Sequence, residues 1–373
     1  MGINMAFRGF RKDGRMPDEA ETRGESPLKA YGRTTARAGR RYRCSFVLGF
    51  AICYTISWTA AAAGAAPPRL QVPVGCTLGQ DCFIQNYFDV DPGPRASDYA
   101  CGPLANDGHK GIDFRVRDLT DVARGVPVLA AAAGEVASVR DGVADGFPDE
   151  LAALGNQGRE CGNGVVLDHG DGWNTQYCHL RQGSVTVAPG ETLRAGDAIG
   201  QVGMSGLAEF PHLHLTVWHR DRAIDPFLGP GVTAGCRSAP HPLWQDDAAR
   251  RLPYLASGVL NAGFASVEPS LRGIERGDYL NDPPRPHSSL WFYVRMFGLR
   301  PGDRQRLRVF GPQGRLVMEW TSAPAESTEI HWVQPIGRQA PEQGWPPGRY
   351  RGEFILIRKG AVVLESLAET NVR

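Results

Sequence analysis

Short runs of alternating apolar and polar residues, separated by glycine, proline and aspartate, dominate the chain from residue 109 onward. Apolar residues at every second position are typical of strands with one buried face. The clearest runs up to residue 219 are "GIDFRV", "VPVLAAAAGEVASV", "GNGVVLDHGDGWNTQYCHL", "SVTVAPGETLRAGDAIGQVG" and "PHLHLTVWH". Short strands punctuated by turn residues predict an antiparallel all-β domain.

One hairpin stands out. The runs "NGVVLD" and "WNTQYC" flank "HGDG", whose glycines permit a tight reversal of the chain. Folding back at this point brings Cys161 near Cys178, and we expect these two cysteines to be bridged. The segment from Asp141 to Glu160 interrupts the strands and is predicted to be a surface loop with a helical turn at "DELAAL".

Strand patterns return near the C-terminus, in "LWFYVRMF", "QRLRVFGPQGRLVMEW", "EIHWVQ" and "GRYRGEFILIRKGAVVLES". They predict a small immunoglobulin-like β-sandwich over residues 286–373. Residues 236–285 mix prolines, arginines and short apolar pieces, which indicates a packed linker. The fold class is therefore mainly β, with two folded units.

The N-terminal residues 1–65 differ in character from the rest. Residues 1–43 hold 11 Lys/Arg and 5 Asp/Glu, and the uncharged stretch from Cys44 to Ala66 follows them. A basic segment followed by an apolar one predicts a signal peptide, with "AGA" at residues 63–65 as a cleavage site; an uncleaved signal anchor is the alternative. We expect a periplasmic or secreted protein that contacts membrane only through this segment if it stays uncleaved.

Charge and cysteine content narrow the picture further. With a net charge of +1 overall, the chain beyond residue 43 has 30 Lys/Arg and 35 Asp/Glu, a balance that does not suit a nucleic-acid partner. Six cysteines follow the leader, all before residue 240 and without a C-x-x-C pair, which suits disulfides formed after export. Their clustering marks residues 66–235 as one unit that begins with a cysteine-rich lead-in.

The candidate chemistry lies in three separate motifs. In "PHLHL", His212 and His214 share one face of a strand while the leucines share the other. The segment "DGHKGIDFRV" places His109 in a loop before a strand that carries Asp113 on its polar face, and "YCHL" contributes His179. Two histidines and one carboxylate form the ligand set of a catalytic zinc site with a fourth position open to water.

The order and wording of these motifs resemble a known family. "HKGID", "GNGVVLDHGDGWNTQYCHL", "GQVGMSG" and "PHLHL" followed by "AIDP" are similar, in this order, to the lysostaphin-type or LytM-like zinc metallopeptidases, over about residues 100–230. Members of that family cut peptide bonds in bacterial peptidoglycan. The resemblance implies an antiparallel β-sheet metallopeptidase domain within residues 66–235.

The resemblance also implies roles for individual residues. His109, Asp113 and His214 would hold one Zn²⁺ per chain. His212 would be a general base or proton shuttle, and His179 would orient water or stabilise the tetrahedral intermediate, although which of the two abstracts the proton stays open.

Other residues near the motifs have simpler interpretations. We expect Tyr177 to be structural, His169 to serve the hairpin turn, His219 to face away from the metal, and His287 and His331 to be surface or turn residues. Two positions depart from the family pattern. Phe210 stands where many relatives have glycine, and Thr216 replaces a frequent acidic residue.

Three functions follow as hypotheses. The first is an exported zinc endopeptidase that hydrolyses peptide stems or cross-bridges of peptidoglycan by zinc-activated water with histidine acid/base assistance. The second is an inactive LytM-like peptidoglycan-binding regulator of a cell-wall amidase, which usually lacks one or more ligands. The third is an envelope adhesin, which needs an exposed patch formed by the C-terminal tryptophans Trp291, Trp320, Trp332 and Trp345.

Overall fold

The computed structural model describes residues 66–153, 160–232, 235–236 and 240–373. The predicted leader and its cleavage site lie outside these residues. No helix in the described ranges combines the length and apolar character needed to cross a membrane.

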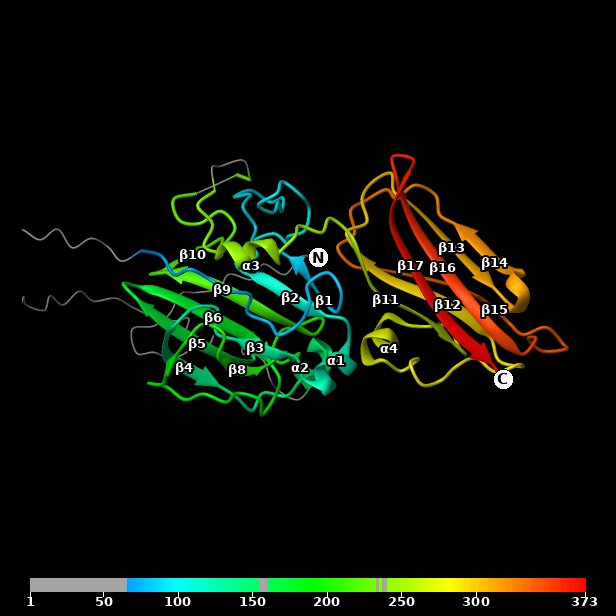
Figure 1. Cartoon of the computed structure of the whole chain (residues 1–373), viewed down its shortest axis with the longest axis horizontal. Coiled ribbons are helices and arrows are strands. Elements are labelled where there is room, and N and C mark those ends of the chain that lie inside the picture. Colours follow the sequence, from blue (N-terminus) through cyan, green and yellow to red (C-terminus); the bar gives the residue numbers. More distant parts are fainter. Residues whose placement is uncertain (1–65, 154–159, 233–234, 237–239) are drawn as a thin grey trace, which may run out of the picture.

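A large antiparallel sheet forms the N-terminal unit (Figure 1). Its strand order is β1-β2-β9-β6-β5-β4-β7, with β10 paired to β9. The bounds are β1 Cys82–Asn86, β2 Ile112–Val116, β4 Gly134–Arg140, β5 Asn163–Gly170, β6 Trp173–Leu180, β7 Thr192–Leu193, β9 His212–His219 and β10 Arg222–Ile224; β3 Pro127–Leu129 and β8 Ala198–Gln201 pair separately. The expected mainly-β class is confirmed.

The predicted hairpin is strands β5 and β6, which pair in antiparallel register. The Cys161–Cys178 bridge closes its open end, as expected. The other cysteines beyond residue 66 pair as Cys76–Cys82 and Cys101–Cys236. The last of these ties the lead-in to the segment that follows β10, so three bridges brace one unit.

Two short helices flank the N-terminal unit. Helix α1 spans Leu119–Arg124 and is capped by the preceding Asp118, whose carboxylate accepts a hydrogen bond from the backbone N–H of Thr120. Helix α2 spans Pro148–Ala153 within the 141–160 segment, which confirms the helical turn predicted at "DELAAL".

Two more antiparallel sheets make up the C-terminal unit. Their orders are β11-β12-β15 and β14-β13-β16-β17. The bounds are β11 Gly258–Ala265, β12 Leu290–Phe297, β13 Arg304–Phe310, β14 Leu316–Thr321, β15 Trp332–Arg338, β16 Gly348–Arg358 and β17 Ala361–Val372. Buried residues of both sheets share one core, among them Phe292, Val294, Leu307, Phe354 and Leu356. Of the four tryptophans that the adhesin hypothesis needs, Trp345 is buried and the others are half-buried.

The stretch expected to be a linker contains regular structure. Helices α3 (Asp246–Arg250) and α4 (Leu271–Arg276) lie in it, and strand β11 pairs along β12. The sequence "GVLNAGFA" of β11 is rich in small residues, so its apolar alternation is weak although its backbone completes a sheet.

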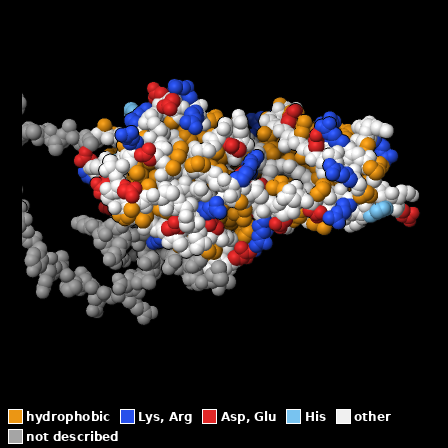
Figure 2. Space-filling view, turned by 60° about the horizontal axis from the view of Figure 1, so that its bottom comes forward, with side chains coloured by type: hydrophobic (Ala, Val, Ile, Leu, Met, Phe, Trp, Pro, Cys, Tyr) orange, Lys and Arg blue, Asp and Glu red, His pale blue; other side chains and the backbone are white. Residues whose placement is uncertain are grey.

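The two units pack directly against each other. Phe83 of β1 meets Phe297 of β12 edge to face, with ring centroids 5.6 Å apart. Leu260 and Phe297 belong to the same buried cluster as the core of the N-terminal unit. Helix α4 lies where the two units meet (Figure 1). Basic and acidic side chains are interspersed over the described surface visible in Figure 2.

Candidate metal centre

Strand pairing brings the three predicted ligands together. Strands β2 and β9 are antiparallel neighbours in a register that places Asp113 opposite His214. His109 lies in the turn before β2, where its backbone carbonyl accepts a hydrogen bond from the N–H of Asp89. Gly111 of "HKGID" makes room for this arrangement, because a Cβ there would lie 2.4 Å from Nε2 of His214.

The three ligand atoms converge. Nε2 of His109 lies 3.2 Å from Oδ1 of Asp113 and 3.2 Å from Nδ1 of His214, and the last two atoms are 2.8 Å apart. Ligand atoms at 2.0–2.1 Å from a tetrahedral zinc ion are separated by about 3.3 Å. The triangle is therefore the size that a zinc ion requires, and the donor set of two imidazoles and one carboxylate suits that metal. These residues form a candidate metal site.

Each of the three side chains is oriented by a further hydrogen bond. Nδ1 of His109 donates to the carbonyl of Tyr87 at 2.7 Å, and Nε2 of His214 is hydrogen-bonded to the Thr216 hydroxyl at 2.9 Å. With these partners on the outer side of each ring, the inward-facing ring nitrogens are placed to serve as metal ligands. The amide of Asn86 donates to Oδ2 of Asp113 at 2.8 Å, which leaves Oδ1 for the metal.

Two further histidines lie beside the cluster. Nδ1 of His212 donates to the carbonyl of Phe210 at 2.7 Å, and Nδ1 of His179 donates to the carbonyl of Ser205 at 2.8 Å. Their ring centroids are 4.6 Å apart. His179 has a backbone φ of 64°, a left-handed conformation that is costly for a residue other than glycine and typical of functional positions. Its N–H is held by the carbonyl of Cys161.

Burial controls the electrostatics of this group. Burial lowers the pKa of His212 to about 4, against the charge of Asp113 and the Phe210 hydrogen bond. Burial, together with the neighbouring His212 and His214, lowers the pKa of His179 well below its ordinary value. Burial alone would raise the pKa of Asp113, but electrostatic interaction with the His109 and His212 rings and hydrogen bonding with His109 and His214 lower it well below its usual range. The carboxylate is thus charged, and His179 and His212 are neutral imidazoles able to accept a proton.

The remaining predicted positions are structural. The Tyr177 hydroxyl accepts from the N–H of Ala131, and His169 bonds the carbonyl of Ala133 beside the hairpin turn. His219 stacks on Trp173 at the end of β9, with ring centroids 4.3 Å apart. None of these three residues contributes an atom to the ligand triangle.

Several groups that support the site were not predicted from the sequence. Asn86 comes from β1, outside the quoted motifs, and the carbonyls of Tyr87, Phe210 and Ser205 have no side-chain signal. Arg115 is fully buried opposite His212, and its guanidinium lies 4.3 Å from the centre of the Phe210 ring. The alternation of Asp113 with Arg115 on the polar face of β2 was the available signal for this arginine.

Comparison with known proteins agrees with this site. The model of peptidase family M23 matches residues 107–226. An uncharacterised metalloprotease of Haemophilus influenzae is 33% identical over 133 residues, which cover 35% of this chain and 23% of that protein. The peptidoglycan DD-endopeptidase ShyB of Vibrio cholerae is 34% identical over 64 residues, which cover 17% of this chain and 15% of that protein.

Among solved structures, the catalytic domain of lysostaphin from Staphylococcus simulans is 23% identical, with a TM-score of 0.24 and coverage of 38% of this chain and 85% of that domain. The chain spans less than a quarter of the length of the two sequence relatives named above, and the residues beyond 226 fall outside the family match. The ordered motifs, the family match and the His109–Asp113–His214 cluster together identify residues 107–226 as a domain of peptidase family M23.

Proposed function

We propose that this protein is an exported zinc metalloendopeptidase that hydrolyses peptide bonds in the stems or cross-bridges of bacterial peptidoglycan. The observation that carries the proposal is the convergence of His109, Asp113 and His214 into one triangle, each held by its own hydrogen-bond partner. Every ligand position is filled, whereas an inactive regulator usually lacks one.

One Zn²⁺ per chain would be held by Nε2 of His109, Oδ1 of Asp113 and Nδ1 of His214. When bound, zinc supplies a Lewis acid for the activation of water and the scissile carbonyl. A single anionic ligand leaves the site electrophilic. The burial of Asp113 keeps competing solvent away from its charge.

Proton transfer falls to the neighbouring imidazoles. The Phe210 and Ser205 carbonyls fix the protons of His212 and His179 on Nδ1, so Nε2 of each ring is the atom that takes up a proton. We assign His212 as the general base or proton shuttle and His179 as the group that orients water or stabilises the tetrahedral intermediate. Proton return to the leaving amine completes hydrolysis.

Location and substrate rest on separate observations. The three disulfides of the N-terminal unit suit an oxidising compartment such as the periplasm or the exterior of the cell. The substrate class follows from membership of residues 107–226 in the M23 family and from the relative named as a peptidoglycan endopeptidase.

Exchange of His214 for alanine tests the assignment. One lost ligand opens the triangle, so the His214→Ala protein should retain neither zinc after gel filtration nor hydrolysis of peptidoglycan peptides. Exchange of His219 for alanine on the same strand is the matched control and should keep both, because His219 is outside the cluster. Full activity of His214→Ala would overturn the proposal, and native protein purified gently without zinc would favour the regulator.

A further inference from the structure

A hollow of about 370 Å³ lies where the M23 domain meets the C-terminal unit. Asn86 and Phe210 line it from the metal-site side, and Leu271, Glu275 and His331 line it from the C-terminal unit. The hollow adjoins the metal centre, since Asn86 also bonds Asp113 and Phe210 also bonds His212. Its volume is in the range of small-ligand pockets.

Several polar atoms in these walls have no hydrogen-bond partner within the described part of the chain. They are Oδ1 of Asn86, Oε1 of Glu275 and Nε2 of His331. Asn86 and Glu275 are 3% and 2% exposed. Buried polar atoms normally have partners because an unmade hydrogen bond costs about 1–3 kcal/mol. Two of the three are oxygens that can only accept, so a matching ligand would present hydrogen-bond donors, for example amide N–H groups.

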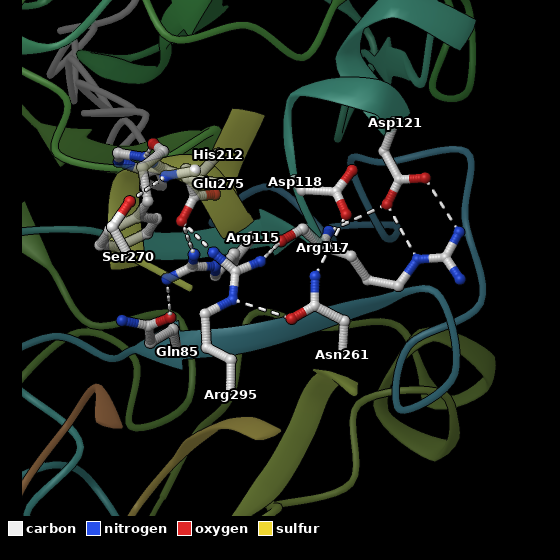
Figure 3. A network of polar contacts seen from close by, with 12 residues as sticks. Gln85, Arg115, Arg117, Asp118, Asp121, His212, Asn261, Ser270, Glu275 and Arg295 are labelled. Carbon is white, nitrogen blue, oxygen red and sulfur yellow. Dashed lines mark hydrogen bonds and ion pairs between the residues drawn. The ribbon is translucent and has the colours of Figure 1, made fainter. Parts of the chain in front are cut away.

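A buried ion network fixes the position of Glu275, one of the residues that line the hollow (Figure 3). Its Oε2 accepts from Arg115 of β2 at 2.6 Å and also from Arg295 of β12. Arg115 donates in addition to Gln85 at 2.6 Å, and Arg295 to Asn261 at 3.1 Å. Glu275 therefore has one oxygen committed to two arginines and the other available to a ligand.

The charge around the hollow favours a neutral ligand. Arg115 and Arg295 share the carboxylate of Glu275, and the exposed Glu209 adds a second negative charge to the lining of the hollow. Arg272 lines it too and is paired with Asp149.

Burial and the charges of Arg115 and Arg295 lower the pKa of His331 to about 2, so its ring is neutral. Phe147, Phe210, Leu271 and Ile330 provide apolar walls.

We propose that this hollow is a substrate subsite that takes an uncharged peptide segment with small apolar side chains through its amide N–H groups, and that Glu275 and His331 determine its specificity. The inference rests on the proposed peptidase function. It assigns part of the substrate site to the C-terminal unit, beyond the residues matched by the family.

Direct binding tests the subsite independently of hydrolysis. The probe is N-acetyl-alanyl-alanine amide, titrated into the zinc-loaded chain and followed by ligand-observed NMR. We expect saturable binding at least about tenfold tighter than for the same dipeptide with a free carboxylate or a free amine, because the hollow is balanced in charge. Equal binding of all three forms would contradict the selectivity for a neutral segment, and the absence of saturable binding would contradict the subsite itself; either result would overturn the inference.

A larger side chain at the edge of the hollow tests whether the neutral probe binds there. Leu271 at its edge is 47% exposed, and Leu316, which does not line the hollow, is 48% exposed. Exchange of Leu271 for tryptophan should weaken binding of the neutral probe about tenfold or more, while Leu316→Trp leaves it unchanged. Equal effects of the two changes would contradict the proposal.

Two variants of His331 distinguish a role in substrate binding from a role in folding. His331→Phe should raise KM for a cleaved peptide several-fold with little change in kcat and with zinc content unchanged, and His331→Gln should restore most of the lost affinity. A fall in kcat alone would contradict a binding role. If the chain hydrolyses no peptide while the neutral probe still binds and Leu271→Trp abolishes that binding, the proposed function fails and the subsite stands.

Discussion

The ligand triangle depends on the atoms behind it. His109 and His214 present opposite ring nitrogens, Nε2 and Nδ1, because the other nitrogen of each ring is hydrogen-bonded to a group on the outer side of the cluster. The hydroxyl of Thr216 is hydrogen-bonded to Nε2 of His214 at 2.9 Å. It supplies an orienting hydrogen bond without adding a negative charge beside the candidate metal site.

Exchange of Thr216 for valine tests this contribution. Loss of an orienting partner typically reduces metal affinity about 10- to 100-fold, so we expect a fall of that size in competition with a chromophoric chelator. Thr175→Val on β6 is the matched control, since it also removes a hydrogen bond to a histidine, His169, that lies outside the cluster. Equal zinc affinity of both variants and the native chain would contradict the orienting role.

At the residue scale, the sequence was sufficient to predict the side chains of the candidate metal site. It did not predict most of the groups that orient those side chains. His109, Asp113 and His214 occur in compact motifs with strand periodicity. The carbonyls of Tyr87 and Phe210 belong to the backbone, which every residue has, so no sequence pattern marks them. His331 was expected at the surface or in a turn, yet it is half-buried in the hollow, because its surroundings come from segments more than 50 residues away.

At the scale of elements, the β5–β6 hairpin positions His179. The Cys161–Cys178 bridge holds the hairpin end, and the Cys161 carbonyl binds the N–H of His179. Glycine turns and alternating apolar residues made this hairpin predictable. Strand β11 was not predicted, since its small residues are stabilised by pairing with β12 rather than by a strong pattern of their own.

Removal of disulfides should destabilise the protein according to the length of chain that each one closes. The Cys161–Cys178 bridge spans 17 residues and Cys101–Cys236 spans 135. Replacement by alanine pairs should cost about 3 and about 5 kcal/mol respectively, because the unfolded chain gains more freedom from the longer loop. Urea unfolding of the two double variants measures the difference, and the reverse order would contradict this explanation.

At the scale of the whole molecule, the two units are joined by a buried network as well as by apolar packing. Arg115 of the metal-site sheet and Arg295 of the C-terminal unit share Glu275 of α4, and all three side chains are at most 2% exposed (Figure 3). The same Arg115 packs on Phe210, whose carbonyl orients His212. The C-terminal unit is thus connected through contiguous contacts to the side of the M23 domain that carries the candidate metal site.

Exchange of Glu275 for glutamine should lower the free energy of unfolding by about 3–5 kcal/mol, because two buried arginines lose their shared counter-charge. Glu150→Gln is the matched control: Glu150 pairs with Arg272 and Arg276 at the surface, and its loss should cost about 1 kcal/mol at most. Calorimetric unfolding of the two variants measures how much free energy of unfolding each one loses. Equal losses would show that the buried network does not hold the units together.

The most direct test of zinc-dependent peptidoglycan hydrolysis is mass spectrometry of purified peptidoglycan after digestion with the protein, with a chelator, and with zinc restored after chelation. We predict fragments that arise from cleavage of peptide bonds, their absence under chelation, and their return with zinc. Fragments that persist at full yield under chelation, or a digest without any cleaved peptide bond in the presence of zinc, would contradict the proposed activity.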